Sequence, residues 1–394
     1  MPFFCHYCGK ERADDELTKE HVLPKALGGN VTPTNPFALD VCKRCNTACG
    51  RHVDGPFIRS FSTQMDRFAN ARRYIDLDRD AVVPLLYLGE SQDVQWEGKL
   101  CDYWQGPAGD HVFHFHLRYP DTDSVRPVVG HPLNAKAEEI DPGFVLIFLI
   151  ATHTQWVRCV IRSVMEQIDD AKIYVVNVNP QPQGPRFGEI PESLKPLIEQ
   201  LWQLLRKPLN NRIALQPDIG DRFLAKLALG FGSLLLDEAF RTSEDATKLR
   251  NYVWARTAEE REALKLHGTN FFNSLTQSRP GYSINDAIGW KPGHVILLQA
   301  FERLALSVMF YGSQSATVAV TANPAHWQGR LLGTGSPQST VYLVAPGFRT
   351  FVGPVPLSRY VAARGELAKG RILPEVGPFL KQVEEHPPPP PFED

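Results

Sequence analysis

The chain has 394 residues, of which 43% are hydrophobic and 22% are charged, and its net charge is −2. This composition predicts a globular protein of two or three domains and excludes a disordered or collagen-like chain. The longest apolar run, residues 144–151, is far too short to cross a bilayer, so we expect no membrane segment. Seven cysteines and the lack of an apolar signal-peptide core in MPFFCHYCGKER lead us to expect a reducing, cytoplasmic setting.

Two CxxC pairs, Cys5 with Cys8 and Cys42 with Cys45, come first along the chain. A CxxC turn presents two sulfurs to one ion, and four sulfurs form the tetrahedron that Zn²⁺ prefers. So short a segment lacks the apolar residues for a core of its own, and zinc binding would supply much of its folding free energy. The spacing therefore predicts a structural zinc site, with four unrelated free cysteines as the alternative.

Between the two pairs, Glu20 and His21 are followed by a proline, a Gly-Gly turn and Asn35, and Asn46 comes directly after the last cysteine. This order of residues resembles the HNH endonucleases, most closely their four-cysteine branch, to which the phage endonuclease VII type also belongs. The resemblance covers only about the first 60 residues.

The family fold implied by this resemblance is a two-stranded hairpin and a helix over one catalytic metal, the ββα-metal arrangement. We expect its strands at residues 18–23 and 37–41 and its helix from about Cys42. The fold class expected for the chain is α+β, with an N-terminal ββα-metal (HNH) module that carries structural zinc, followed by a large mixed α/β region.

The resemblance also assigns roles in hydrolysing a phosphodiester bond. His21 is the general base, which suits a side chain whose pKa lies near working pH. Glu20 and Asn46 are the protein ligands of the catalytic ion, and Asn35 ties down the loop and orients the histidine.

Two departures from the common family pattern bear on the metal. Glu20 stands where many relatives carry Asp, and the second helix histidine of the frequent HxxxH ending is replaced by Gly50. A shell of one carboxylate, one amide oxygen, water and phosphate suits Mg²⁺ or Mn²⁺ better than a catalytic Zn²⁺. We therefore expect dependence on Mg²⁺ or Mn²⁺.

Positive charge gathers in the same part of the chain. Residues 1–73 contain eleven Lys or Arg and eight Asp or Glu, a balance of +3, whereas the whole chain carries −2. Such residues are candidates for contacts with the phosphate backbone, although ordinary solvated surface also explains scattered cations. The candidate nucleic-acid-binding residues are Lys19, Lys25, Lys43, Arg44, Arg51 and His52.

Four side chains lie beside these motifs in the sequence. His52 and Asp54 are candidates for phosphate or outer-shell contacts, with a solvated helix end as the alternative. His6 is expected at the surface because the four thiols already complete the zinc site. Cys49 is expected to be a buried small apolar residue.

The remainder of the chain predicts a strand-rich stretch and then a helical block followed by more strands. In HVFHFHLRY, His114 and His116 share one face, which we interpret as a half-exposed strand because a third metal donor is not evident. Strands are expected at residues 81–89, 111–119, 144–151, 157–164, 172–178, 295–301, 304–311, 317–321 and 341–345. Helices are expected at residues 57–74, 191–207, 218–240, 243–255 and 258–267, with Asp218 and Ser243 as N-caps.

These features divide the chain into residues 1–75 as the HNH module, 76–370 as an α+β sensing or target-binding region of one or two domains, and 371–394 as a proline-rich tail. The favoured function is a metal-dependent endonuclease acting on DNA. Antiviral defence is a candidate setting, and an activating protein partner or a homo-oligomer is a candidate assembly. Two alternatives remain: a zinc-dependent nucleic-acid-binding protein without catalysis, and a nuclease effector subunit that is inactive without a guide-binding or ligand-sensing partner.

Overall fold

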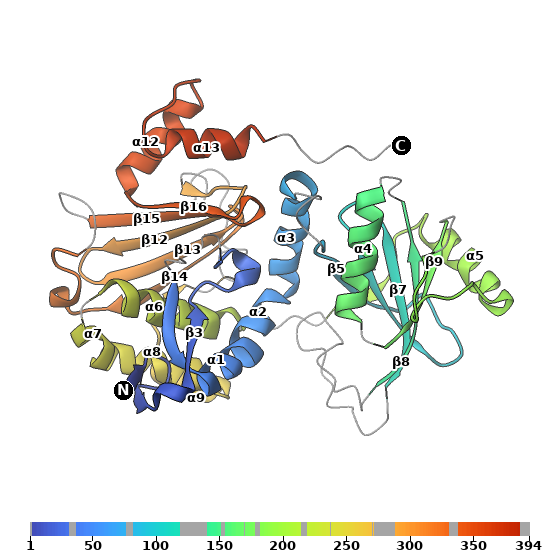
Figure 1. The fold of residues 1–394 in the computed structure, drawn as a ribbon, viewed down its shortest axis with the longest axis horizontal. Coiled ribbons are helices and arrows are strands. Elements are labelled where there is room, and N and C mark those ends of the chain that lie inside the picture. The colour runs from blue at the N-terminus through green and yellow to red at the C-terminus, as the bar shows by residue number, and fades with distance from the viewer. Residues whose placement is uncertain are drawn as a thin grey trace. The chain divides into compact units, whose positions relative to one another are not determined.

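A computed structural model describes residues 2–30, 37–75, 82–118, 140–150, 154–168, 170–177, 182–213, 219–236, 238–269, 271, 288–330 and 338–386. The chain forms two compact units. The first joins Met1–Ile58 to Pro217–His386, and the second is Arg59–Gln216 (Figure 1). The boundary between these compact units lies after Ile58, whereas the expected domain boundary was residue 75. The expected domain division stays a prediction.

The N-terminal module consists of two short hairpins and a helix. The strand pair β3–β4 and the helix that follows it match the expected ββα order, and α1 begins one residue after Cys42. Residues Gly50–Asp54 form a π-helical turn between α1 and α2. The elements are β1 (Phe3–Cys5), β2 (Lys10–Arg12), β3 (Leu17–His21), β4 (Ala38–Cys42), α1 (Lys43–Cys49) and α2 (Gly55–Ile58).

The rest of the first unit is a group of helices on a six-stranded antiparallel sheet, whose order is β11-β14-β13-β12-β15-β16 (Figure 1). Ser243 caps α8 as expected, because its hydroxyl accepts a hydrogen bond from Ala246 N. The helices are α6 (Ile219–Leu235), α7 (Glu238–Thr242), α8 (Glu244–Trp254), α9 (Ala258–Leu264), α12 (Leu357–Leu367) and α13 (Gly377–Glu384). The strands are β11 (Gly268–Thr269), β12 (His294–Ala300), β13 (Leu304–Phe310), β14 (Gln314–Thr321), β15 (Gln338–Ala345) and β16 (Thr350–Pro356).

One hydrophobic core runs through the N-terminal module, α6 and this sheet. The rings of Phe57 and Phe223 stack with centroids 4.0 Å apart, and Phe57 also lies 5.6 Å from Phe310. A Cβ at Gly230 would lie 2.5 Å from Val22, so glycine permits α6 to approach the end of β3 closely. The module therefore shares its core with residues more than 150 positions away in sequence.

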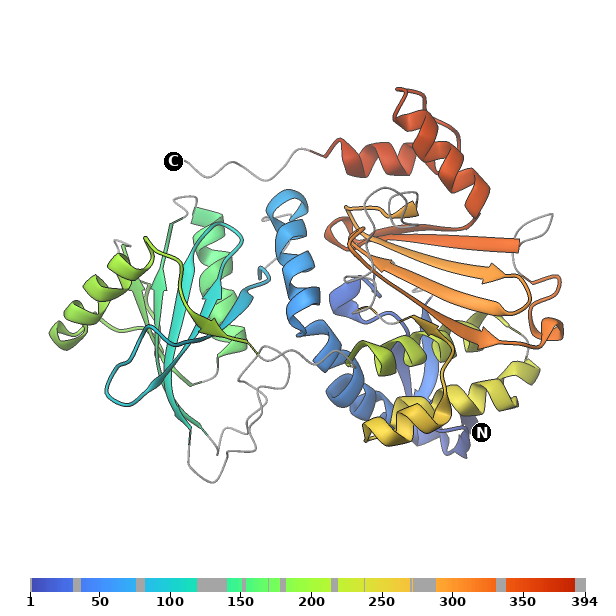
Figure 2. The ribbon, with the colours of Figure 1, turned by 180° about the vertical axis from the view of Figure 1, so that it is seen from behind.

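The second unit is a six-stranded sheet with helices on both faces (Figure 2). Its order is β10-β5-β6-β7-β8-β9, and α4 connects β8 to the parallel strand β9. The helix α4 packs on one face and α5 on the other. The elements are α3 (Phe61–Tyr74), β5 (Leu86–Ser91), β6 (Leu100–Gln105), β7 (His111–Arg118), β8 (Ile140–Phe148), α4 (Thr154–Gln167), β9 (Lys172–Val176), α5 (Lys195–Leu204) and β10 (Asn211–Arg212).

Several expected elements differ from the observed ones. The strand predicted at residues 157–164 is wrong, since that segment lies inside α4, whose buried side chains Trp156, Val160 and Val164 recur at helical spacing. The helix predicted at residues 57–74 is divided, because α2 ends at Ile58 and α3 begins after Ser60. The strands β6 and β16 and the helices α12 and α13 were not expected.

Three expectations concern residues outside the described ones: Asn35, the Asp218 cap and the proline-rich tail after His386. Among the helices that the structure describes, none is long and apolar enough to cross a membrane.

Candidate functional site

The four cysteines of the two CxxC pairs come together at one end of the N-terminal module. Cys5 ends β1, Cys8 lies in the turn between β1 and β2, Cys42 ends β4, and Cys45 lies in the first turn of α1. Their sulfur atoms all lie within 4.8 Å of one another. Ligands about 2.3 Å from one tetrahedral Zn²⁺ would lie about 3.8 Å apart, so the four sulfurs fit a shared ion.

Thiol protonation in this cluster also favours a bound cation. A hydrogen bond with Cys45 lowers the pKa of Cys5, and the same bond raises the pKa of Cys45 above its ordinary value. Thiols packed this closely do not all keep their protons, and thiolate is the form that binds zinc. The expected structural zinc site is supported by this cluster.

The helix α8 of the first unit holds the turn that carries Cys5 and Cys8. Arg250 Nε donates a hydrogen bond of 2.8 Å to the carbonyl of His6, and Trp254 Nε1 donates one of 2.8 Å to the carbonyl of Tyr7. His6 itself is 5% exposed, so its expected surface position is wrong. Burial is the main cause that lowers its pKa to about 4. Cys49 is fully buried, as expected.

The hairpin of β3 and β4 positions Glu20 and His21 on opposite faces. Glu20 pairs with Leu39 across the strands and His21 with Ala38, and successive side chains of a strand alternate between faces. His21 is partly exposed, and burial, followed by the charges of Lys25 and Lys226, lowers its pKa. The imidazole is therefore neutral near pH 7, which is the form that accepts a proton.

Asn46 attaches α1 to the face of β3 that also carries Glu20. Its amide nitrogen lies 3.3 Å from Thr18 Oγ1 and 3.2 Å from the carbonyl oxygen of Lys19. Thr18 and Glu20 are two positions apart on the strand and so share a face. The structure thus brings Glu20 and Asn46 to the same side of β3, whereas His21 points to the other side.

A buried lysine that the sequence interpretation missed contacts Glu20. Lys226, on the apolar helix α6, is fully buried, and its Nζ lies 2.6 Å from Glu20 Oε1 and 2.7 Å from Asp54 Oδ2. It also donates to the carbonyl of His21 at 3.3 Å. Glu20 is itself only 6% exposed. A single lysine within the apolar run FLAKLALGFG was the available signal, because a charge on a buried helix face requires a partner.

Protonation of this ion-pair group follows from burial and charge together. Burial alone would lower the pKa of Lys226, but the charges of Asp54 and Glu20 reverse the effect, and the pKa is raised. Burial raises the pKa of Asp54 to about 6 against the opposing effect of Lys226. Asp54 is therefore neither a solvated helix end nor a solvent-facing phosphate contact, and that expectation is corrected.

A groove of about 700 Å³ runs beside the zinc cluster. Five of its lining residues are Lys or Arg and none is Asp or Glu, and Trp254 supplies an aromatic face. The pKa of His52 in the groove is lowered by burial and by the charges of Arg51, Arg222 and Arg256. The lining is Cys8, Lys10, Arg12, Arg44, Cys45, Ala48, His52, Arg222, Trp254 and Arg256.

The expected nucleic-acid-binding residues divide between this groove and other surfaces. Arg44 and His52 line the groove, whereas Lys19 forms an ion pair with Asp40 across the hairpin. Two further arginines line the groove: Arg222 on α6 and Arg256 just after α8. Their spacing in the sequence gave no indication that they lie near the N-terminal module. Of the remaining candidates, Lys25, Lys43 and Arg51 are exposed.

Comparison with known proteins bears on the N-terminal module alone. Residues 5–62 match the profile of the HNH endonuclease family. No characterised protein and no solved structure gave a significant match to the chain.

Proposed function

The N-terminal module belongs to the HNH endonuclease family, and from this premise we propose that the protein is a divalent-metal-dependent nuclease that hydrolyses DNA phosphodiester bonds. The proposal is supported by the match of residues 5–62 to the HNH endonuclease family and by the ββα order of this module, in which we assign the catalytic roles to Glu20, His21 and Asn46. Asn35 keeps its expected positioning role as part of the proposal.

His21 is the proposed general base. Its neutral imidazole removes a proton from a water molecule as the water oxygen attacks phosphorus, the bond to the leaving oxygen breaks, and that oxygen takes a proton from solvent. The lowered pKa keeps the base form populated below pH 6.5. General-base catalysis contributes roughly 10²–10⁴-fold to rate.

Glu20 and Asn46 would hold Mg²⁺ or Mn²⁺ through oxygen atoms. When bound, the ion neutralises charge on the scissile phosphate and on the leaving oxygen. Lys226 contacts Oε1 of Glu20, so the proposal assigns Oε2 to the ion. Glu20 and Asp54 carry two negative charges against one positive charge on Lys226 when both are ionised, and this excess favours a further cation.

The basic groove is the proposed path for nucleotides that flank the scissile phosphate. Its α1 residues Arg44 and Ala48 are each two positions from Asn46, so at about 100° per residue each lies about 160° around the helix from it. The groove therefore faces away from the proposed catalytic side of α1. Its cations suit phosphates, and the indole of Trp254 suits a base or sugar.

The test is plasmid nicking by the purified chain with Mg²⁺ or Mn²⁺. We expect His21→Ala to lower the rate by roughly 10²-fold or more while zinc content and circular dichroism stay unchanged. The matched control is His267→Ala, which removes an exposed histidine of the same unit and should cut at the parent rate. Equal rates for His21→Ala and the parent would contradict the proposed base.

A second candidate function is nucleic-acid binding without hydrolysis. It is favoured by one observation, that Lys226 already occupies one oxygen of Glu20 as a permanent cation. This alternative predicts DNA binding that depends on the basic groove and on zinc, with no nicking by the parent protein under any divalent ion.

A further inference from the structure

A buried group of two histidines and one carboxylate lies in the sheet of the second unit. Asp102 on β6 stands directly opposite His114 on β7, and His116 is two residues further along the same face. Asp102 and His116 are fully buried, and His114 is 1% exposed. One ligand atom from each of the three residues lies within 4.8 Å of the other two. The strand was expected to be half exposed, and this expectation is wrong.

The burial has a clear cause in the helix α4. Val112 shares the face of β7 with the two histidines and packs in one core with Trp156 and Val160 of α4. A carboxylate and two imidazoles in such surroundings lose their hydration, which costs several kcal/mol unless other partners replace the water. These three buried groups therefore require partners that replace their hydration.

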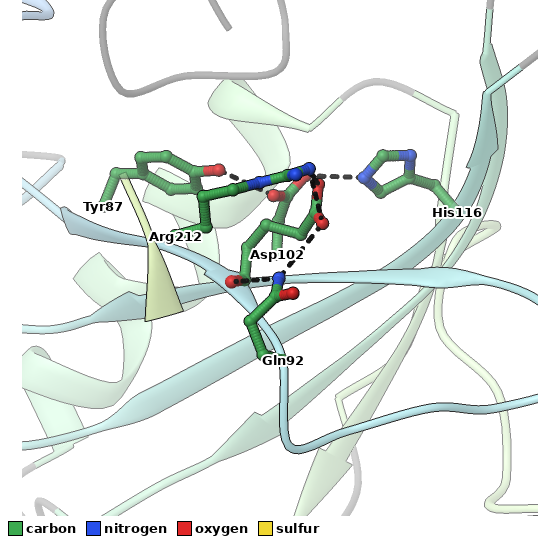
Figure 3. A network of polar contacts seen from close by, with 6 residues as sticks. Tyr87, Gln92, Asp102, His116 and Arg212 are labelled. Atoms are coloured by element: carbon green, nitrogen blue, oxygen red, sulfur yellow. Dashed lines mark hydrogen bonds and ion pairs between the residues drawn. The ribbon is translucent and has the colours of Figure 1, made fainter. Parts of the chain in front are cut away.

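Hydrogen bonds account for part of this stabilisation (Figure 3). Tyr87 donates to Asp102 Oδ1 at 2.7 Å, and His116 Nε2 lies 2.5 Å from Asp102 Oδ2. Among the described groups, His116 Nδ1 is buried and has no hydrogen-bond partner.

A neighbouring carboxylate is already neutralised by an arginine. Glu90 stands opposite Asp102 on β5, and Arg212 Nη2 contacts both of its oxygens, at 2.9 and 3.1 Å. Gln92 adds a hydrogen bond of 3.2 Å to the same carboxylate. Glu90 is thus satisfied by this arm of the network, whereas Asp102 contacts the imidazole of His116 (Figure 3).

We propose that Asp102, His114 and His116 form a second metal site, which binds a divalent transition-metal ion of the Zn²⁺ class. Two imidazole nitrogens and a carboxylate oxygen suit Zn²⁺ and its neighbours, whereas Mg²⁺ and Ca²⁺ prefer shells of oxygen alone. Ligand atoms about 2.0–2.2 Å from one ion lie roughly 3–3.5 Å apart, so atoms within 4.8 Å need only small side-chain adjustments.

The hydroxyl of Tyr87 would then act as the outer partner that orients a metal-binding carboxylate. The site joins β6 to β7 and is closed to solvent, so the proposed ion would link the two strands rather than meet a substrate. It lies outside residues 5–62 and does not depend on nuclease activity.

Metal content of the full-length protein tests the proposal. After equilibration with Zn²⁺ and removal of loose metal, we expect two equivalents per chain, one at the four cysteines and one here. Asp102→Asn and His114→Ala should each retain one equivalent. The control His111→Ala removes a histidine on the opposite face of the same strand, bonded to Tyr103 at 2.7 Å, and should retain two. A single equivalent in the parent, or two in Asp102→Asn, would overturn the proposal.

Cobalt substitution of the parent gives a readout that does not depend on whether the variants fold. The cysteine site should show sulfur-to-cobalt charge transfer, and a second equivalent of Co²⁺ should add visible ligand-field bands without more charge transfer, because no sulfur belongs to the proposed site. Failure of the parent to bind a second equivalent would contradict the site.

Discussion

Replacing Lys226 with methionine tests whether the buried ammonium stabilises the N-terminal module. Methionine replaces the apolar stem of the side chain but lacks the ammonium group, which lies 2.6 Å from Glu20 and 2.7 Å from Asp54. Two buried carboxylates then lose their counter-charge in a site where Lys226 has no exposed surface. Breaking one side of a buried ion pair costs about 3–5 kcal/mol, and we expect Lys226→Met to lower the free energy of unfolding by that amount.

The matched control is Lys369→Met, which removes an ion pair with Glu366 at a distance of 3.0 Å. The side chain of Lys369 is 64% exposed, so its pair contributes only about 0–1 kcal/mol. Urea unfolding at pH 7.5 with saturating Zn²⁺, followed by circular dichroism, measures both variants. Because neutralising Asp54 removes part of the uncompensated charge, Lys226→Met with Asp54→Asn should lose less stability than the sum of the two single changes. A loss for Lys226→Met no larger than that for Lys369→Met would refute the argument.

Three further predictions concern protonation, zinc and the groove. The raised pKa of Asp54, about 6 against an ordinary 3.8, makes its ionisation unfavourable in the fold, so stability from this group is present below pH 4 and lost as pH rises to 6. We compare the free energy of unfolding of the parent with that of Asp54→Asn. The parent value minus the variant value should fall by on the order of 3 kcal/mol between pH 4 and 6, and a difference that does not change with pH would exclude a raised pKa at Asp54. Cys8→Ser should release the sulfur-bound zinc and lower the melting temperature, and a chelator should then cause no further loss at that site; unchanged zinc content would contradict the ligand assignment. Arg44→Gln with Arg256→Gln should weaken DNA binding and reduce the slope of log K against log salt by roughly 1–2, whereas Arg303→Gln, outside the groove, should leave the slope unchanged; equal slopes in all three proteins would exclude the groove as the DNA path.

The sequence predicted the parts of the site whose geometry is local. Each CxxC pair and the Glu20–His21 dipeptide lie within a few residues, and Asn46 follows Cys45 directly, so strand alternation and one helix turn determine most of their arrangement. Lys226 is different, because it reaches Glu20 from more than 200 residues away through the packing of α6. Periodicity places a lysine on a helix face but does not say which carboxylate it meets.

The misread segment at residues 157–164 explains the error at the two histidines. A run rich in valine and isoleucine, VRCVIRSV, has the composition of a strand, yet it forms α4 and covers the face that carries His114 and His116. Because residues 157–164 were predicted as a strand, no helix was expected to cover the face of β7 that carries His114 and His116. The third donor, Asp102, comes from β6, a strand that the sequence interpretation did not include.

The pH dependence of single-turnover DNA cleavage, measured with saturating Mn²⁺, tests most directly whether His21 is the base of an HNH nuclease. We predict that the logarithm of the parent rate rises with unit slope to a plateau, with a midpoint below pH 6.5 because the pKa of His21 is lowered. His21→Ala should lose both the rate and this titration. A parent protein that does not cleave, or a His21→Ala variant with the same profile as the parent, would contradict it.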